Sequence, residues 1–399
     1  MKKTIYIVDD QSEVLETAVM VVRALMPEAE VTGFTHAHAA LAAVKTNPPD
    51  LILSDYRMPD MKGGELLEAV RLASPGTLRI IMSGFVSLDK LTVITSAHQY
   101  VAKPFDAGQL KELLRRSFAA RKRMSDDGLK GVVAGLRSLP SLPQVQHSLL
   151  VELEDNRGAS ATIGQMVAQD AGLSSKVLQL ANSPLFGRDY LITNPVDAVL
   201  CLGTNLICAV VLAQTLFKHF QNSAHPATSL PAIWSHCWET AALAQVYCRE
   251  QGLPRSMQEE AFLAGLLHET GRLILIDNFP QEFQAALDAA LRANAPLAHH
   301  LRENFKASPS QIGAFLLDLW GMPDNVVAAL ASLDNPEALG EGKFSITAAL
   351  FIADQIATRK FPADPCQPSE WKTDFLRSIN CPEDAKSWER SELASVNTA

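Results

Sequence analysis

The chain is 399 residues long, which is more than a single hydrophobic core usually organises, so its length predicts two or more domains. Hydrophobic residues make up 47% of the chain and charged residues 20%, a composition typical of a folded globular protein and not of a disordered or fibrous one. The formal net charge is −9, and no basic stripe or basic recognition helix stands out. These features argue against direct binding to nucleic acid.

The amino-terminal residues and the apolar stretches predict a cytoplasmic protein. Met1 to Lys3 lead into a short apolar run that ends at Asp9, which is too short for the core of a signal peptide. The longest apolar stretch, residues 198–217, is interrupted at residues 203–205 by Gly-Thr-Asn, which ends one helix and begins another. We therefore predict two buried helices there and no membrane partner. The six cysteines form no Cys-x-x-Cys pair, and we interpret them as reduced thiols in the core.

The first third of the chain alternates short β-rich apolar runs with amphipathic helical patterns, an order typical of a parallel sheet covered by helices on both faces. The predicted strands are Thr4–Val8, Glu30–Phe34, Asp50–Ser54, Leu78–Met82 and Gln99–Ala102. The predicted helices cover residues 11–25, 37–46, 64–73, 86–95 and 107–123. These five β–α units predict an open α/β sheet, in which ligands bind beyond the carboxyl ends of the strands.

Charged and hydroxyl side chains follow four of these strands. Asp9 and Asp10 come after the first strand, Asp55 after the third, Ser83 after the fourth and Lys103 after the fifth. Carboxylates this close together repel one another, and Mg²⁺, a hard cation that prefers oxygen ligands, relieves the repulsion. With the metal in place, Asp55 can attack a phosphoryl donor and form an acyl phosphate. Lys103 and the Ser83 hydroxyl can each bind a phosphoryl oxygen.

The segments IYIVDD, LILSDYRMPDMKGGELL, IIMSG and YVAKPF resemble response-regulator receiver domains, and the resemblance covers residues 1 to about 123. It implies a flavodoxin-like (βα)5 fold and a phosphoacceptor at Asp55 that is phosphorylated by a histidine kinase. It also implies a Mg²⁺ site formed by Asp10, Asp55 and the backbone carbonyl of Arg57, with Asp9 completing the acidic pocket.

Two further features of the resemblance concern the response to phosphorylation. Tyr100, three residues before Lys103, matches the aromatic switch that changes rotamer when the hydroxyl of Ser83 moves toward the phosphoryl group. Gly63-Gly64 matches the tight turn before the third helix. Taken singly, Asp9 is equally well explained as a helix cap or turn former, and Tyr100 as a strand aromatic. The common order and spacing favour function, so we predict a receiver competent for phosphorylation.

A polar stretch at residues 124–128 follows the basic end of the fifth helix and predicts a short linker after a receiver domain of residues 1–123. From residue 129 to about 360 the strand patterns disappear and helical periodicity dominates, which predicts an all-helical domain. Residues 361–399 are polar with scattered prolines. We predict a partly ordered carboxy-terminal extension, tethered to the helical domain by Trp371, Leu376 and Trp388.

The helical region contains, in order, the segments LPSLPQVQHSLL, IGQMVAQDAGLSSKVLQLANSPLFG, DAVLCLGTNLI, HCWETAALA, AFLAGLLHETGRLIL and IGAFLLDLWGMP. Together they resemble an HDOD domain, the helical output module related to HD metal-dependent phosphohydrolases but usually short of their metal ligands. The resemblance covers roughly residues 129–360.

Catalysis by the HD relatives needs an adjacent His and Asp that bridge two metals, together with further His and Asp ligands. His236 and His268 are present here, but Glu269, one methylene longer, stands in place of the Asp. Pro309 and Leu333-Asp334 occupy positions where relatives often carry histidines. The resemblance therefore implies a degenerate HD site with no cofactor, in which His268 is a hydrogen-bonded core histidine.

The two resemblances together predict a two-component response regulator that takes part in a phosphorelay. A histidine kinase phosphorylates Asp55, and the receiver controls a non-catalytic HDOD domain that binds a signalling protein or a nucleotide messenger; formation of a homodimer stays open. The alternative is a metal-dependent phosphodiesterase or phosphohydrolase that acts through His236, His268 and Glu269. A full His-Asp ligand set would distinguish this enzyme from the binding module, and the sequence does not supply it.

Overall fold

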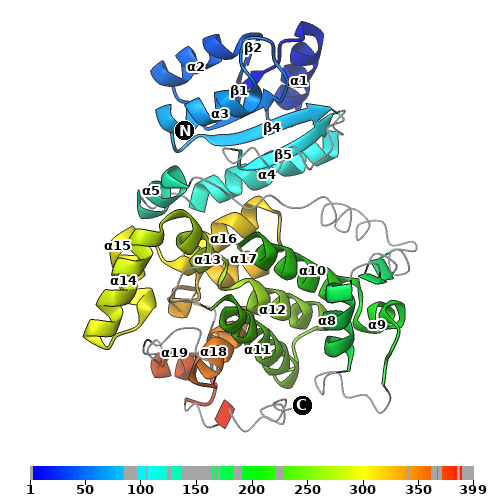
Figure 1. Ribbon diagram of the computed structural model, residues 1–399, viewed down its shortest axis with the longest axis vertical. Coiled ribbons are helices and arrows are strands. Elements are labelled where there is room, and N and C mark those ends of the chain that lie inside the picture. Colours follow the sequence, from blue (N-terminus) through cyan, green and yellow to red (C-terminus); the bar gives the residue numbers. More distant parts are fainter. Residues whose placement is uncertain are drawn as a thin grey trace. The chain divides into compact units, whose positions relative to one another are not determined.

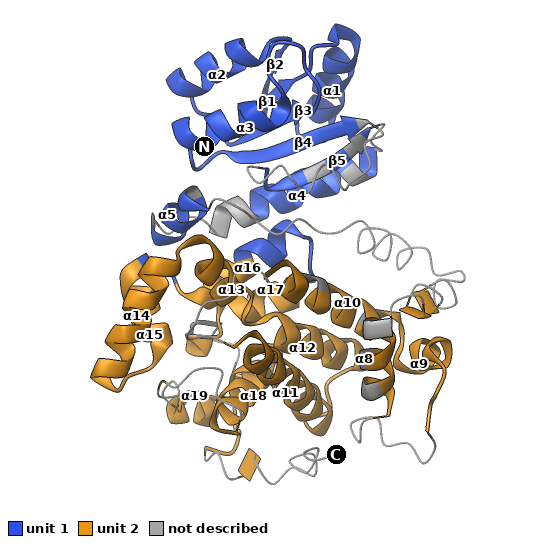
Figure 2. Cartoon of the chain, in the orientation of Figure 1, with its two compact units in different colours: residues 1–141, 305–307, 315–322 blue, residues 142–304, 308–314, 323–399 orange. Residues whose placement is uncertain are grey.

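In the computed structural model (Figure 1) the described residues are 3–84, 97–103, 107–123, 127–136, 163–164, 167–168, 171–182, 191–220, 229–339, 342–360, 366, 371–383 and 387–388. The chain divides into two compact units (Figure 2). The first consists of residues 1–141, 305–307 and 315–322, and the second of residues 142–304, 308–314 and 323–399. The predicted fold classes, α/β for the first part of the chain and helical for the second, are confirmed.

A five-stranded parallel sheet with the strand order β2-β1-β3-β4-β5 forms the centre of the first unit. Its strands are β1 (Thr4–Val8), β2 (Glu30–Phe34), β3 (Leu51–Asp55), β4 (Leu78–Gly84) and β5 (Gln99–Lys103). The chain adds β2 on one side of β1 and β3 on the other, so the connections leave in opposite directions at the carboxyl ends of β1 and β3. A crevice forms at such a switch point, and it is where ligands of open α/β sheets bind.

The strands agree closely with the prediction, and the differences concern their carboxyl ends. β3 begins and ends one residue later than predicted, and β4 and β5 continue to Gly84 and Lys103. The backbone ladder pairs Asp55 with Met82 and Gly84 with Lys103, because backbone groups form hydrogen bonds whatever the side chain carries. Asp55 and Lys103 are therefore the last residues of their strands, which holds their backbones firmly. The predicted helix at residues 86–95 lies outside the described residues.

Helices cover both faces of this sheet. α1 (Ser12–Leu25) contacts α4 (Ala107–Arg123), and α2 (Ala37–Thr46) contacts α3 (Gly63–Ala73). The face under α2 and α3 has a continuous apolar core, made by Tyr6, Val8, Ile52 and Ile81 of the sheet and by Ala40, Val44, Leu66, Leu67 and Val70 of the helices. Burying apolar surface in this core, which contributes about 25 cal/mol per Å², stabilises the sheet that carries the acidic residues.

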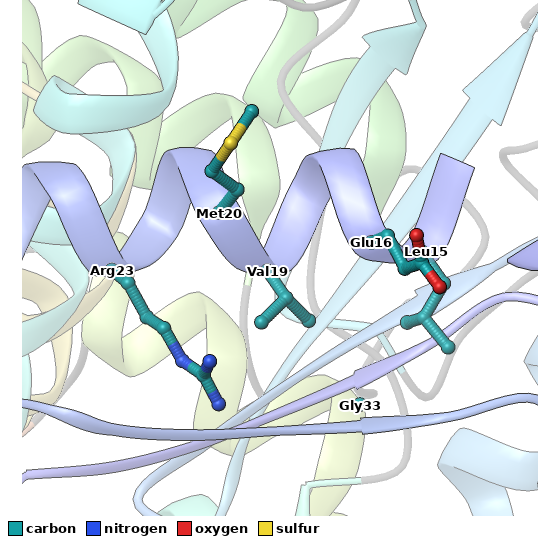
Figure 3. Close-up of a pocket in the computed structure, with 6 residues that line it drawn as sticks. All are labelled: Leu15, Glu16, Val19, Met20, Arg23 and Gly33. Atoms are coloured by element: carbon teal, nitrogen blue, oxygen red, sulfur yellow. The ribbon is translucent and has the colours of Figure 1, made fainter. Parts of the chain in front are cut away.

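A groove of about 430 Å³ lies on the surface between α1 and β2 (Figure 3). Leu15 and Val19 point toward Gly33 of β2, whereas Met20 points away and is 65% exposed. A Cβ atom at Gly33 would lie 3.1 Å from Val19, tighter than most contacts of this kind. Gly33 therefore lets α1 pack closely on β2, while the Arg23 guanidinium donates to the Val31 carbonyl at 2.8 Å.

The described residues from 127 onward form helices and no strand, as predicted for residues 129–360. They are α5 (Asp127–Gly135), α8 (Ala171–Ala181), α9 (Pro195–Leu202), α10 (Thr204–His219), α11 (Leu230–Glu250), α12 (Arg255–Leu267), α13 (Thr270–Asn278), α14 (Pro280–Ala293), α15 (Leu297–Phe305), α16 (Pro309–Leu319), α17 (Asp324–Ala331), the short 3-10 helix η4 (Pro336–Leu339), α18 (Ile346–Lys360) and α19 (Thr373–Ser378).

Three of these helices, α11, α12 and α18, pack against one another and form the centre of the second unit. Gly265 of α12 lies directly on Ala241 of α11, and a Cβ atom at Gly265 would collide with the Ala241 backbone. Two small residues at the crossing allow two helix backbones to approach this closely. The close approach positions His236 on α11 near His268 at the end of α12.

The apolar stretch at residues 198–217 contains two helices, α9 and α10, as predicted. Gly203 separates them with a φ of 88°, a conformation that glycine adopts without strain. Among the described residues no single helix is long and apolar enough to cross a membrane. The pair 195–202 and 206–219 meets the length and composition criterion only when joined, and it bends by 118° at the break.

Three carboxy-terminal residues predicted to tether the extension pack in the helical unit: Trp371, Leu376 and Trp388. Leu376 is fully buried, and Trp388 is nearly so. The Tyr247 hydroxyl of α11 donates to the Trp388 carbonyl at 3.2 Å. The Trp371 ring faces Phe351 of α18 and lies 5.0 Å from the guanidinium of Arg359.

Candidate functional site

An acidic pocket lies at the carboxyl edge of the parallel sheet, and Lys103 joins two of its carboxylates. The Lys103 ammonium lies 2.5 Å from Oδ1 of Asp55 and also binds Oδ2 of Asp9. Burial by itself lowers the pKa of Lys103, but the carboxylates of Asp55 and Asp9 outweigh burial and raise this pKa. Lys103 is therefore a charged ammonium that neutralises part of the pocket.

The backbone holds the Asp55 and Asp9 carboxylates in defined orientations. Oδ2 of Asp55 accepts a hydrogen bond from the Arg57 N–H at 2.7 Å. Oδ1 of Asp9, a residue only 1% exposed, accepts one from the Gln11 N–H at 3.0 Å at the start of α1. Asp9 thus satisfies a backbone donor in the turn before α1 and also contacts Lys103.

Gly63 explains how α3 approaches the pocket so closely. A Cβ atom at this position would collide with the backbone carbonyl of Asp55 and lie 3.0 Å from the Ser54 hydroxyl. The Gly63 N–H donates to the Tyr56 carbonyl at 3.1 Å, which closes the loop after β3. The glycine is therefore required by this close approach and not by an unusual φ angle.

Asp10 carries the feature that fits a cation. Its Oδ1 atom is buried and has no hydrogen-bond partner among the described residues. A buried carboxylate oxygen without a donor is costly unless a positive charge comes close to it. The pocket supplies only oxygen ligands, which are the ligands that Mg²⁺ prefers, so the residues present fit this ion. Mg²⁺ usually keeps several waters, and one or two carboxylates suffice to bind it.

Ser83 lies on β4 and Tyr100 on β5, the two strands that follow β3 in the sheet. Ser83 is nearly buried in β4 and pairs with Ala102 of β5, one position before the Gly84–Lys103 pair. The backbone of Tyr100 pairs with Ile81, but its side chain lies outside the described part of the structure. The structure thus brings Asp9, Asp55 and Lys103 into direct contact, and it leaves the rotamer of the predicted switch open.

A second cluster of ionisable side chains lies inside the helical unit. The Nε2 atoms of His236 and His268 are 3.1 Å apart, and Oδ1 of Asp354 on α18 lies 3.1 Å from the first and 3.4 Å from the second. Nδ1 of His268 donates to the Gly265 carbonyl at 2.7 Å, which orients its Nε2 toward Asp354. Nδ1 of His236 is buried and has no partner among the described residues.

Glu269 lies at the edge of this cluster. One of its carboxylate oxygens, Oε1, is 3.8 Å from Nε2 of His268 and 4.0 Å from Nε2 of His236, while Oε2 lies 3.6 Å from the Arg272 guanidinium. The ligand atoms of His236, His268 and Glu269 also all lie within 4.8 Å of one another. Sequence reasoning selected all three of these residues.

Electrostatics couple the two histidines to Asp354. Burial raises the pKa of Asp354, but hydrogen bonds from His236 and His268 outweigh it and hold the pKa well below its usual range. Burial lowers the pKa of His268, while Cys237 and the Asp354 carboxylate raise it, and the net direction is upward. Asp354 is therefore an ionised carboxylate next to two imidazole rings.

Comparison with known protein families gives two matches that together span most of the chain. The model of the response regulator receiver domain matches residues 5–115, and the model of the HDOD domain matches residues 139–336. The chain is a response regulator with a receiver domain and an HDOD domain. The resemblances inferred from the sequence motifs are thus confirmed.

Relatives of this response regulator match parts of it. It is similar to the DNA-binding transcriptional regulator NtrC of Proteus hauseri, with 35% identity over 125 residues that make up 29% of this chain and 24% of NtrC. It is also similar to the transcriptional regulatory protein ZraR of Salmonella typhimurium, with 28% identity over 184 residues, or 46% of this chain and 40% of ZraR. The chain therefore spans less than half the length of these relatives.

A solved structure of an HDOD domain protein of unknown function from Geobacter sulfurreducens has a similar fold. The two superpose with a TM-score of 0.52 at 21% identity, and the match covers 71% of this response regulator and 91% of the Geobacter chain. At this identity the similarity concerns the fold alone.

Sequence reasoning missed Asp354, the carboxylate closest to the two histidines. It is the one charged residue in the run Ile346–Ala357, which is apolar apart from Thr347, Asp354 and Gln355, and a charge without a partner would be costly there. That signal could have drawn attention to it. Pro309, in contrast, begins α16, and Leu333-Asp334 lie in the turn after α17.

Proposed function

We propose that this response regulator is phosphorylated on Asp55 by a histidine kinase in the presence of Mg²⁺, and that phosphorylation controls an HDOD domain that binds a signalling partner. The observation that carries the first half is the pocket itself, in which the Asp55 carboxylate lies between the Lys103 ammonium and the Arg57 N–H. Asp10 follows the neighbouring strand β1, and its buried Oδ1 atom has no donor among the described residues. The cytoplasm is the compartment in which such a kinase would act.

In this proposal the Asp55 carboxylate is the nucleophile. One of its oxygens attacks the phosphorus of a phosphohistidine, the P–N bond to the donor breaks, and a mixed anhydride forms at Asp55. The Arg57 N–H keeps the carboxylate oriented during this step. Lys103, which contacts Asp55 beforehand, then binds a phosphoryl oxygen, and the Ser83 hydroxyl donates to another.

Asp10, Asp55 and the Arg57 carbonyl would hold the Mg²⁺ ion, with Asp9 at the back of the pocket. When bound, Mg²⁺ neutralises charge on the carboxylate and phosphoryl oxygens. The buried Oδ1 atom of Asp10, which has no hydrogen-bond partner among the described residues, would gain a positive neighbour. Phosphorylation replaces the single negative charge of Asp55 by about two on the acyl phosphate, so an already acidic pocket gains about one negative charge and the ion matters more afterwards.

For the HDOD domain we propose a binding role, with a protein or a nucleotide messenger as the partner and without nucleic acid. Hydrolysis by the HD relatives relies on two bridged metals. The described residues bring together two histidines, Glu269 and Asp354, and Glu269 stands where the relatives carry the bridging Asp. A regulatory binding domain is thus the better supported reading, and a phosphohydrolase is the alternative.

Phosphorylation is tested by incubating the full-length chain with Mg²⁺ and either acetyl phosphate or a phosphorylated kinase. We expect the wild type to give an acid-labile phosphoprotein that shifts on a phosphate-affinity gel, and Asp55→Asn to give none. Glu28→Gln removes an exposed carboxylate that pairs with Lys3 far along the chain from Asp55, and it should react like the wild type. Phosphorylation of Asp55→Asn at the wild-type level would refute the assignment.

A further inference from the structure

The helix α2 receives its cap from a distant part of the chain. Its own N-cap residue is His36, whose side chain accepts no hydrogen bond from the described helix. Instead Oδ2 of Asp60, which lies in the loop after β3, accepts the N–H of Ala37, the first residue of α2, at 2.9 Å. The first N–H groups of a helix have no acceptor within the helix, so a carboxylate from another loop satisfies one of them here.

Both oxygens of the Asp60 carboxylate form hydrogen bonds. Oδ1 accepts the N–H of the next residue, Met61, at 3.0 Å, while Oδ2 binds the start of α2. The partial positive charge at the amino terminus of a helix also attracts a carboxylate. Asp60 is therefore held from two sides, and it joins the loop after β3 to α2.

Apolar contacts attach the same loop to α2. Met58 is 6% exposed and belongs to the core that also contains Ala37 and Ala40 of α2, and Met61 packs against this core. Protein interiors are close-packed and transmit strain, so a shift of the loop affects the start of α2.

The loop after β3 also forms part of the acidic pocket. The Arg57 N–H binds the Asp55 carboxylate at 2.7 Å, three residues before Asp60. The connection from β2 to α2 is tied to the pocket a second time, because the Asp9 N–H donates to the Phe34 carbonyl at 3.1 Å. The entry to α2 is thus held by the backbone of Asp9 on one side and by the side chain of Asp60 on the other.

We propose that Asp60 is a positioning residue for the acidic pocket. It ties the loop that carries Arg57 to α2, so that ion binding in the pocket and order at the start of α2 stabilise each other. This inference rests on the proposed function, in which the Arg57 carbonyl is a ligand of Mg²⁺; Asp60 acts through that backbone and does not touch the ion. Coupling of this kind is reciprocal, so each event favours the other by the same factor.

Hydrogen exchange at the start of α2, measured on the full-length chain with and without saturating Mg²⁺, tests the coupling together with calorimetric titration of Mg²⁺. In the wild type we expect Mg²⁺ to slow this exchange about fivefold, the lower end of typical coupling between two sites. Asp60→Ala should lose the effect and, by the same linkage, bind Mg²⁺ about fivefold more weakly. Asp60→Asn keeps an oxygen that can accept the Ala37 N–H, and it should retain both properties.

Asp50→Ala is the matched control. Asp50 also accepts a backbone N–H, that of Thr4 at 2.7 Å, but it does so at the amino ends of β1 and β3, at the opposite edge of the sheet from the pocket. This variant should keep the wild-type Mg²⁺ affinity and the effect of Mg²⁺ on α2, and an equal loss in it would overturn the proposal.

Two other outcomes separate this inference from the proposed function. Wild-type Mg²⁺ affinity and an unchanged Mg²⁺ effect on α2 in Asp60→Ala would show that Asp60 is a helix cap alone, which overturns the inference and leaves phosphorylation of Asp55 in place. A wild-type chain that binds no Mg²⁺ would overturn the inference and the proposed Mg²⁺ site together.

Discussion

Replacing Lys103 by methionine tests how the acidic pocket is stabilised in the absence of a metal. The side chain keeps its length and apolar stem but loses the ammonium that contacts Asp55 at 2.5 Å and also binds Asp9. Asp9 is 1% exposed, so without Lys103 its carboxylate is buried without a counter-charge and next to Asp55. We expect the receiver to become less stable in buffer without Mg²⁺.

The magnitude follows from the contact distance and the burial. At 2.5 Å and an effective dielectric constant of about 20, the gross attraction between Lys103 and Asp55 is about 7 kcal/mol, most of which the cost of dehydrating both charges cancels. Removing one partner of a buried ion pair typically costs 3 to 5 kcal/mol. Because Lys103 is 18% exposed and the carboxylates can take up protons, we expect the lower end, about 3 kcal/mol.

Native-state hydrogen exchange of peptides from β1 and β3 measures this cost in the full-length chain. A loss of about 3 kcal/mol should speed their slowest exchange roughly 150-fold, and Mg²⁺ should restore part of the protection by replacing the missing charge. Lys45→Met, at an exposed lysine near the end of α2, is the matched control and should stay within about 0.5 kcal/mol of the wild type. Exchange in Lys103→Met within threefold of this control would refute the argument that Lys103 stabilises the pocket.

Three further predictions concern packing, coupling and catalysis. Gly265→Ala should destabilise the helical domain by about 2 kcal/mol, because the new Cβ atom collides with Ala241. Gly131→Ala is the control: its Cβ atom would meet no atom outside its own helix within 4 Å, so thermal unfolding should show it to be neutral or stabilising. Equal effects of the two substitutions would contradict the close helix crossing. Beryllofluoride, which mimics the phosphoryl group, should change the hydrogen exchange of residues 129–360. Tyr100→Ala should reduce that change but still permit phosphoryl transfer. Identical protection with and without beryllofluoride would exclude this coupling between the two domains. The purified protein should hydrolyse no cyclic dinucleotide or nucleoside phosphate, and turnover that disappears in His268→Ala would show instead that the HDOD domain is an enzyme.

The sequence alone was sufficient for the sheet and for most of the acidic pocket. Continuous apolar strands and amphipathic helices alternate in the first third of the chain, and period and polarity are local properties that can be read without a structure. The carboxyl ends of parallel strands meet at one edge, so residues that follow different strands must come together. For this reason Asp9, Asp55 and Lys103 could be grouped from their positions, and the structure brings them into contact.

The cluster in the helical domain depended on tertiary structure. His236, His268 and Asp354 are separated by 32 and 86 residues along the chain, and no periodicity relates a residue on α18 to the end of α12. Packing of α11, α12 and α18 decides which faces meet, and it depends on details such as the close contact of Gly265 with Ala241. A motif could identify the two histidines and Glu269, but only the packed helices place Asp354 beside them, because contacts between helices depend on the shapes of many side chains at once.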